Sequence, residues 1–330
     1  MTSYIPPYEI TDKILSLAAL ISEKIGQITE RNNLESKLHL RKNNKIRSIY
    51  SSLRIEANSL SLNEVKDVIN GKTVLGTVKE IQEVKNAYAA YEEIPEIDPY
   101  SISELKRIHG IMTKYIVDES GTFRQGEEGV FNGDTCIFIA PPARGVPGQM
   151  QELFDWMRGN KEKIHPLILA AVFHYEFVFI HPFSDGNGRM ARLWHTVMLS
   201  KWKPVFEYIP LESQIEKFQD GYYEAIAKSH INGNSTCFVE FMLEQINLVL
   251  EEIRSQPGQP DESISKYVKK LLEVMEYDTA YTAGEILKLL NLKSKDTLRK
   301  NYLNPALDRG LIQMTIPDTP KSKNQRYIRR

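Results

Sequence analysis

Residues 181–192 read His-Pro-Phe-Ser-Asp-Gly-Asn-Gly-Arg-Met-Ala-Arg, and several of these residue types can bind or act on a phosphate. Gly186, Asn187 and Gly188 lie where a loop is predicted to become a helix, so backbone N–H groups and the positive helix end can face an anion. Glycine also lets a phosphate approach the main chain closely. The pattern therefore predicts an anion-binding loop.

Charged and titratable side chains border this loop. Arg189 and Arg192 are three residues apart, hence on one helical face, and can bind further phosphate oxygens by charge-assisted hydrogen bonds. Asp185 suits a Mg²⁺ ion held mainly by substrate phosphates and water, and His181 can act as a general base near neutral pH. Each residue alone is more often a turn, packing or surface residue, so the prediction depends on their joint spacing.

Two buried helices are predicted to hold the loop. Residues 165–180 carry aliphatic and aromatic side chains on all sides, as in a central helix, and the glycine-containing turn opens another apolar helix. The strand signal is scarce, and its best case at residues 135–140 ends at two prolines and predicts a short hairpin. The fold class is therefore mainly α. Helical periodicity is also found at about 10–32, 43–57, 62–70, 74–92, 101–116, 213–229 and 235–254, with capping boxes at Ser61-x-x-Glu64 and Ser101-x-x-Glu104.

Charge divides the chain into two unlike parts. The stretch Ser-Gln-Pro-Gly-Gln-Pro-Asp that begins at Ser255 predicts a linker at about 255–263. Residues 264–330 hold 14 Lys and Arg against 7 Asp and Glu, a net charge of +7, which leaves −8 on residues 1–263 because the whole chain carries −1. The near-neutral total thus conceals a basic C-terminal part.

The composition excludes several classes of protein. A hydrophobic share of 42% with 26% charged residues is typical of a globular chain and excludes wholesale disorder. Two cysteines among 330 residues predict a reducing compartment rather than a disulfide framework. The most apolar stretch, Leu167–Ile180, is too short to span a bilayer, and the N-terminus lacks the layout of a signal peptide. A cytoplasmic protein without membrane contact is expected.

The stretch His181–Arg192 resembles the signature of the Fic family, His-x-Phe-x-Asp/Glu-Gly-Asn-Gly-Arg-x-x-Arg, and satisfies every fixed position. The resemblance covers about residues 100–230 and implies a Fic-type helical bundle with a small β-hairpin flap, here about Phe131–Pro147. It implies transfer of AMP from ATP to a Ser, Thr or Tyr hydroxyl of a target protein that docks on this flap by strand addition. The related Doc branch, which resembles a kinase, typically has Lys where Gly188 stands, so Gly188 favours AMP transfer.

The resemblance also implies a role for each motif residue. His181 would accept the proton of the attacking hydroxyl, and Asp185 would hold Mg²⁺ on the α- and β-phosphates. Residues 186–188 would form the anion hole. Arg189 would support the β-phosphate, and Arg192 the γ-phosphate.

An upstream segment that reads Ser-Ser-Leu-Arg-Ile-Glu-Ala-Asn resembles the inhibitory Ser/Thr-x-x-x-Glu-Gly/Asn element of the same family. Ser52 and Glu56 are four residues apart on one face of the predicted helix at 43–57, and Ala57 stands in the usual Gly/Asn position. The resemblance implies that Glu56 pairs with Arg192 and keeps this arginine from the γ-phosphate of ATP.

Residues 264–330 resemble a winged-helix domain. Two helix patterns, at Tyr281–Leu290 and Ser294–Leu303, are spaced as in a helix-turn-helix, and residues 311–328 could form two strands and a wing. Many such domains contact only proteins, so DNA and protein partners both stay open. The basic side chains that could meet a DNA backbone are Lys293, Lys295, Arg299, Lys300, Arg326, Arg329 and Arg330.

These expectations divide the chain into a helical regulatory region at 1–100, a Fic core at 101–254, the linker and the winged-helix-like domain. The leading function is an autoinhibited protein adenylyltransferase that uses ATP and Mg²⁺. Two alternatives stay open: a bifunctional or de-AMPylating enzyme in which Glu56 positions water, and an ATP-sensing DNA-binding regulator. A homo-oligomer is also left open.

Overall fold

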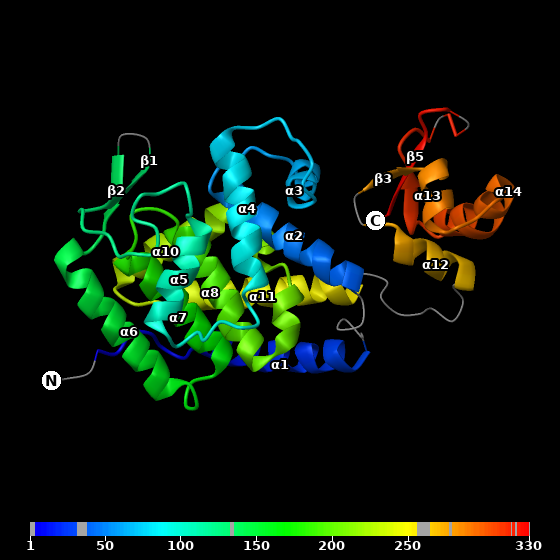
Figure 1. Cartoon of the computed structure of the whole chain (residues 1–330). Helices are drawn as coiled ribbons and strands as arrows, with labels where there is room; N and C mark the ends of the chain where they lie inside the picture. Colours follow the sequence, from blue (N-terminus) through cyan, green and yellow to red (C-terminus); the bar gives the residue numbers. More distant parts are fainter. Residues whose placement is uncertain are drawn as a thin grey trace. The chain divides into compact units, whose positions relative to one another are not determined.

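The computed structural model describes residues 4–31, 38–132, 135–255, 265–276, 279–317, 319–320 and 322–329 (Figure 1). It divides into two compact units. One comprises residues 1–30 and 44–253, and the other comprises residues 31–43 and 254–330. The predicted linker at 255–263 lies outside the described residues, apart from Ser255, which ends a helix.

The part of the chain that precedes the hairpin is helical, as its periodicity predicts. The capping box predicted at Ser61 is formed, and Thr77 forms another that was not predicted. At Ser101 only half of the predicted box exists, because the Glu104 carboxylate pairs with Arg107 instead of the Ser101 backbone. The helices are α1 (Asp12–Arg31), α2 (Leu38–Ile55), α3 (Leu62–Ile69), α4 (Val78–Glu92) and α5 (Ile102–Met112).

The hairpin consists of β1 (Gly129–Asn132) and β2 (Thr135–Ile139), which pair antiparallel with Gly129 opposite Ile139. The predicted flap extends to Pro147, but the structure begins a 3₁₀ turn at Ala143 and α6 at Val146 (α6, Val146–Asn160). Two prolines end the strand, and Pro147 fits the first turn of a helix, so the hairpin is shorter than expected.

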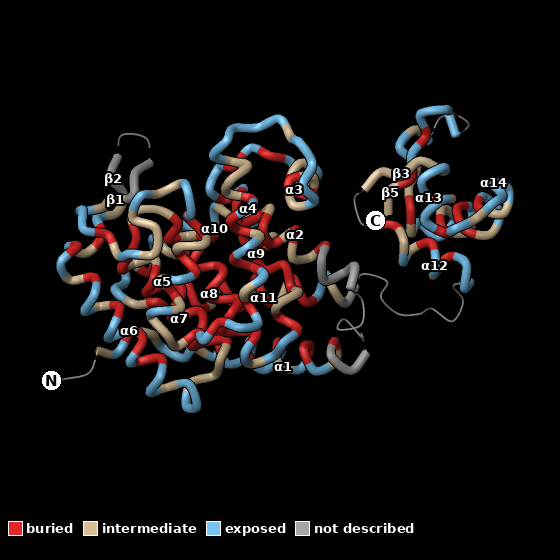
Figure 2. The backbone as a smooth tube through the Cα atoms, in the orientation of Figure 1, coloured by how far each residue is buried: buried red, intermediate tan, exposed pale blue. Residues whose placement is uncertain are grey.

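Two consecutive helices form the centre of the first unit. They are α7 (Pro166–Ile180) and α8 (Asn187–Trp202), and nearly every residue along both is buried (Figure 2). Because α7 is apolar on all sides, other helices must cover it all round. The remaining elements of this unit are a 3₁₀ helix (Pro204–Tyr208), α9 (Leu211–Lys217), α10 (Gln219–Asn232) and α11 (Thr236–Ser255). The prediction of a mainly helical fold with a small hairpin is confirmed.

The second unit has its own apolar core and a three-stranded antiparallel sheet in the order β3-β5-β4. The helix expected from Tyr281 begins two residues later, because Tyr281 lies in β3 and Thr282 caps the helix with a capping box. Its elements are α12 (Lys266–Val274), β3 (Ala280–Thr282), α13 (Ala283–Leu289), α14 (Lys295–Thr297), a π-helical turn (Leu298–Leu303), α15 (Asn304–Asp308), β4 (Ile312–Met314) and β5 (Arg326–Arg329).

Across the residues that are described, none of the helices combines the length and the apolar character needed to cross a membrane.

Candidate active site

The loop between α7 and α8 begins and ends on residues in the left-handed region. His181 follows α7 with φ +52°, which is uncommon for a residue other than glycine and is typical of functional positions. Gly186 precedes α8 with φ +82°, and a Cβ atom there would press on the Thr113 methyl group at 3.0 Å. Glycine is therefore required at 186 by both backbone conformation and space.

Asn187 fixes the loop from inside rather than offering its side chain to a ligand. Its Oδ1 accepts the Phe183 N–H at 3.0 Å, and its Nδ2 donates to the Phe183 carbonyl at 2.7 Å. Both hydrogen bonds are to the main chain of Phe183, four positions earlier, so the Asn187 amide fixes the conformation of the loop. Only the backbone N–H of Asn187 is left for the predicted anion hole.

His109, on α5, supports the same loop and was not singled out by the sequence. Its ring stacks on Phe183 with 3.6 Å between centroids. The Gly121 N–H donates to Nδ1 at 2.9 Å, so the proton sits on Nε2, which donates to the Asp185 carbonyl at 2.9 Å. Burial lowers the pKa of His109 to about 4, so it holds the loop as a neutral imidazole.

Arg124 ties the loop to the base of the hairpin, and it too was missed. The buried guanidinium donates from Nε to the His181 carbonyl at 2.7 Å and from Nη1 to the Gly126 carbonyl at 2.9 Å. Its Nη2 donates to the Pro141 carbonyl just after β2. The partners are all backbone carbonyls, which carry no signature in sequence. Arg124 thereby fixes the main chain of the candidate base.

The His181 imidazole is suited to accept a proton. Burial lowers its pKa below the ordinary value, with the Arg124 charge acting in the same direction, so the ring is neutral at pH 7. Nδ1 lies 3.4 Å from the Val178 carbonyl, an arrangement that assigns the proton to Nδ1 and leaves Nε2 as an acceptor.

The N-terminus of α8 offers unused donors to an anion. Gly186 has no side chain to cap the helix, and the first backbone N–H groups of α8 have no acceptor within the helix. These N–H groups point along the positive end of the helix dipole. The predicted anion hole at residues 186–188 thus has the geometry that a phosphate needs.

Arg192 projects from the second turn of α8 and its side chain is 1% exposed. Nε donates to Ser52 Oγ at 3.1 Å, and Nη2 donates to the Ser52 carbonyl at 3.1 Å and to Glu56 Oε1 at 2.7 Å. The structure therefore places Ser52, in α2, and Glu56, just after α2, in contact with Arg192. These residues are 140 and 136 positions from Arg192 in the sequence. An arginine engaged in this way has few donors left for a phosphate.

Gly188 makes this contact possible. A Cβ atom at Gly188 would overlap Glu56 Oε1 and would lie 3.1 Å from Arg192 Nη1. Glycine at this position therefore lets the Glu56 carboxylate reach Arg192.

The turn that carries Glu56 differs from the helical continuation predicted to residue 57. α2 ends at Ile55, and a Schellman motif follows, in which the Asn58 N–H donates to the Leu53 carbonyl and the Ala57 N–H to the Arg54 carbonyl, both at 3.0 Å. Ala57 has φ +64°, where glycine is normally found. The left-handed backbone at this position explains why the resembled family element prefers Gly or Asn there. Ala57 adopts the same conformation with backbone strain.

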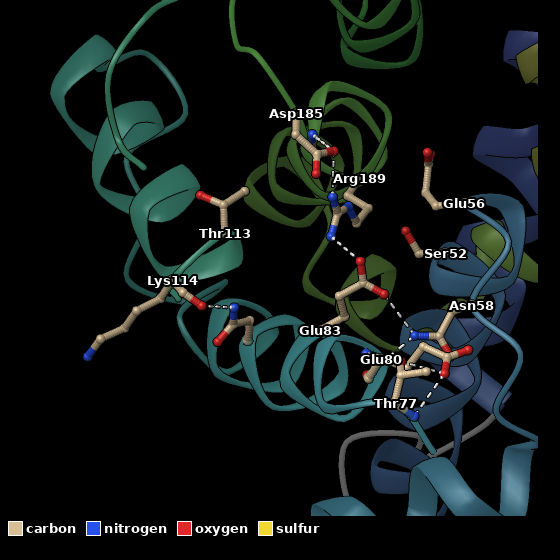
Figure 3. A network of polar contacts seen from close by, with 12 residues as sticks. Ser52, Glu56, Asn58, Thr77, Glu80, Glu83, Thr113, Lys114, Asp185 and Arg189 are labelled. Atoms are coloured by element: carbon tan, nitrogen blue, oxygen red, sulfur yellow. Dashed lines mark hydrogen bonds and ion pairs between the residues drawn. The ribbon is translucent and has the colours of Figure 1, made fainter. Parts of the chain in front are cut away.

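Arg189 is also buried but is less completely engaged (Figure 3). Nη2 donates to Asp185 Oδ1 at 2.8 Å, whereas Nε and Nη1 have no hydrogen-bond partner among the described residues. Two buried donors without an acceptor are costly unless a ligand supplies one. The geometry therefore leaves Arg189 ready for an anion.

Asp185 fits Mg²⁺ in one particular way. Within the described residues no group of three or more His, Cys, Asp or Glu side chains could hold a metal ion, so Asp185 is a single carboxylate at this place. The Asp185 side chain is 40% exposed. Among the described residues, Gly186 and Arg189 donate hydrogen bonds to its Oδ1, so Oδ2 can bind a ligand. One carboxylate suits a Mg²⁺ ion whose other ligands are phosphate oxygens and water.

The loop at the centre of this helical bundle lies next to a neutral imidazole, an open helix N-terminus and two buried arginines, an arrangement that suits an anion. Residues 99–199 match the Fic/DOC family, and residues 266–328 match the Filamentation induced by cAMP protein Fic-like, C-terminal domain. The crystal structure of a Fic family protein from Desulfovibrio desulfuricans G20 is 40% identical, covers 99% of this chain and 98% of its own, and has a TM-score of 0.73. The chain belongs to the Fic family.

Curated relatives match just over half of the chain. The protein adenylyltransferase Fic of Nematostella vectensis is 30% identical over 208 residues, which is 59% of this chain and 45% of the relative. The protein adenylyltransferase fic-1 of Caenorhabditis elegans is 28% identical over 206 residues, or 59% of this chain and 38% of the relative. The chain thus spans less than half the length of these two relatives.

Proposed function

We propose that this chain transfers AMP from ATP to a hydroxyl group of a target protein and releases pyrophosphate. One observation carries the proposal: the His181 imidazole, the open N-terminus of α8 and two buried guanidinium groups border one loop. Transfer of this kind depends chiefly on positioning and charge neutralisation, which these groups supply. The names of the curated relatives support the same activity.

In the proposed reaction the hydroxyl oxygen attacks the α-phosphorus, and its proton passes to His181 Nε2. The bond between the α-phosphorus and the oxygen that bridges to the β-phosphate breaks, and pyrophosphate leaves with the electron pair. Backbone N–H groups of α8 stabilise the charge on the α-phosphate oxygens. Arg189 and Arg192 bind the β- and γ-phosphates. Mg²⁺ at Asp185, when bound, would neutralise further phosphate charge.

We propose that Glu56 inhibits this reaction. Arg192 donates to Glu56 and Ser52, so it cannot bind the γ-phosphate at the same time. ATP would then bind with its α-phosphate out of line for attack, and a displacement of about 1 Å can cost on the order of 100-fold in rate. Release of the Glu56 turn from Arg192 would restore the productive position.

The target is proposed to dock along the β1–β2 hairpin. Arg124 links this hairpin to the His181 main chain, so a segment bound there would lie close to the base. Pairing through backbone hydrogen bonds would give weak selectivity for target sequence. A homo-oligomer and a cytoplasmic location stay predictions from the sequence.

The test of the transfer reaction separates AMP transfer from phosphate transfer. A Glu56→Gly variant is incubated with cell lysate, Mg²⁺ and ATP labelled on either the α- or the γ-phosphate. The proposal expects the enzyme to add protein-bound label over lysate alone with α-labelled ATP only. Added label from γ-labelled ATP, beyond that of lysate alone, would contradict it, and omission of Mg²⁺ with full retention of the added label would contradict the role of Asp185.

Removal of AMP is a second candidate activity of the same site. The Glu56 carboxylate lies beside the anion hole, and its charge acts on His181 against the effect of burial. It could therefore position water for attack on a modified side chain. A Glu56→Gly variant would then lose AMP removal while it gains transfer, which a pre-modified target protein would reveal.

The C-terminal unit favours an additional interaction with DNA. The order of its helices and strands supports the predicted winged-helix-like domain, and Lys293, Lys295, Arg299 and Lys300 are exposed around α14 and the π-helical turn. Arg329 is half-buried and donates to the Met275 carbonyl at the end of α12, so it serves the fold rather than the exposed cluster. Of the other predicted contacts, Arg330 lies outside the described residues.

A gel shift of the full chain on duplex DNA at low and high salt tests this interaction. Phosphate contacts require binding that weakens steeply with salt, and charge reversal of Arg299 and Lys300 should abolish it. Absence of binding at low salt would leave an ATP-sensing DNA regulator without support, as would loss of all cellular effect in a His181→Ala variant.

A further inference from the structure

Glu83 of α4 links Arg189 of α8 to the turn that follows α2, a connection that Ser52 and Glu56 do not make (Figure 3). Its Oε1 lies 3.5 Å from Arg189 Nη1, and its side chain is 12% exposed. Its other oxygen, Oε2, accepts a hydrogen bond from Asn58 Nδ2 at 2.9 Å. Asn58 ends the Schellman turn two residues after Glu56, so the turn touches Arg192 directly and Arg189 through Glu83.

Asn58 is a stable anchor for this link. It is 3% exposed, its Oδ1 accepts the Leu60 N–H at 3.2 Å, and its Nδ2 also donates to the Glu80 carbonyl at 3.3 Å. Every polar atom of the amide is therefore directed by main chain or by Glu83. A shift of the turn would pull on Glu83 Oε2.

The contact between Glu83 and Arg189 is an electrostatic attraction that forms no hydrogen bond with the guanidinium group. At 3.5 Å it is an ion pair, and Nη1 forms no hydrogen bond among the described residues, as is also true of Nε. Asp185 and Glu83 thus hold the guanidinium from two sides while two donors stay unused. A buried arginine fixed in this way is preorganised for a phosphate.

We propose that Glu83 is a positioning residue that sets Arg189 for the β-phosphate, and that Asn58 couples this setting to the turn that carries Glu56. The inference rests on the proposed function, because it takes Arg189 as the β-phosphate contact. Both arginines then respond when the turn moves. Nucleotides with a β-phosphate should depend on Glu83, whereas AMP should not.

The test measures binding of ATP, ADP and AMP by calorimetry to full-length protein in the Glu56→Gly background, where Arg192 no longer pairs with a carboxylate. Glu83→Gln should raise the Kd of ATP and ADP by about tenfold, the loss expected for one misplaced charged hydrogen bond, with AMP changed less than about twofold. Glu92→Gln is the matched control, since it removes one charge nine residues further along α4, from a half-exposed side chain that pairs with Lys45, which also contacts Glu207. That control should bind all three nucleotides as the background does.

Asn58→Ala supplies the second variant and tests the coupling. It should show the same selective loss for ATP and ADP, and the double variant with Glu83→Gln should be no weaker than Glu83→Gln alone. Equal loss for all three nucleotides, unchanged or tighter ATP binding, or additive effects in the double variant would overturn the proposal. Failure of the Glu56→Gly background itself to bind ATP would instead refute the proposed function on which the inference rests.

Discussion

Two segments of the candidate site, the loop before α8 and the turn after α2, are held in very different ways. The loop from His181 to Gly186 is fixed by the Asn187 amide, the His109 ring and the Arg124 guanidinium, all of them buried. The turn from Glu56 to Asn58 exposes Glu56 and Ala57 and relies on two backbone hydrogen bonds and the Asn58 amide. The difference predicts that the loop stays fixed, while the turn that carries Glu56 can move away from Arg192 at a lower cost in free energy.

Loss of the candidate base breaks the chemistry and leaves the turn untouched. His181→Ala in the Glu56→Gly background should lower AMP transfer by about 10²- to 10⁴-fold, because a general base commonly contributes that much. Binding of ATP should stay within a few fold of the parent. Gel measurement of α-labelled protein gives the rate, and a variant that retains most of its labelling would exclude His181 as the base.

Acid should weaken the helix pair that carries the loop. His174 and His195 lie on α7 and α8 with 3.4 Å between their Nδ1 atoms, and burial lowers the pKa of both, that of His195 to about 3. The unfolded chain takes up protons below about pH 6.5, whereas the folded histidines stay neutral, so stability present at pH 7 is lost as the pH falls from 6.5 toward 3.

For His195 alone the loss of stability reaches up to about 5 kcal/mol. Urea unfolding at pH 7, 5.5 and 4 measures it. A His195→Leu variant should show a shallower decline, since it has no proton to take up. An equal decline in both proteins would contradict the assignment of His195 as a buried neutral residue.

A more stable turn should strengthen the inhibition. Ala57→Gly relieves the cost of a Cβ atom at φ +64°, about 1 kcal/mol, so basal labelling by the otherwise unaltered enzyme should fall about fivefold. Tyr115→Gly is the matched control, because Tyr115 has the same φ and is exposed. It should change thermal stability but not labelling. Increased labelling by Ala57→Gly would show that the turn is not strained in the inhibited state.

The sequence was sufficient for the loop because its spacing is local. His181, Asp185 and the two arginines follow one another within a single motif, and the apolar run before it predicts the buried α7. The contact between Glu56 and Arg192 spans 136 positions, so only a family resemblance could suggest it. Periodicity could not place the end of α2, because Ala57 lacks the signal that glycine gives.

The supporting residues were beyond sequence reasoning for a physical reason. Arg124 and His109 act through backbone carbonyls and a ring face, partners that every sequence contains. Glu83 reads as one charge on an amphipathic helix until the fold brings Asn58 and Arg189 to it. Such residues become visible only when buried polar atoms are followed from partner to partner.

The central claim is that the Glu56 carboxylate restrains a competent enzyme. The direct measurement is the initial rate of AMP transfer from α-labelled ATP by the unaltered chain, Glu56→Gln and Glu56→Gly, with Glu216→Gln as a control that removes another carboxylate near α2. Both Glu56 variants should be faster by about 100-fold, and the control should match the unaltered chain. Equal rates for all four proteins would contradict the account.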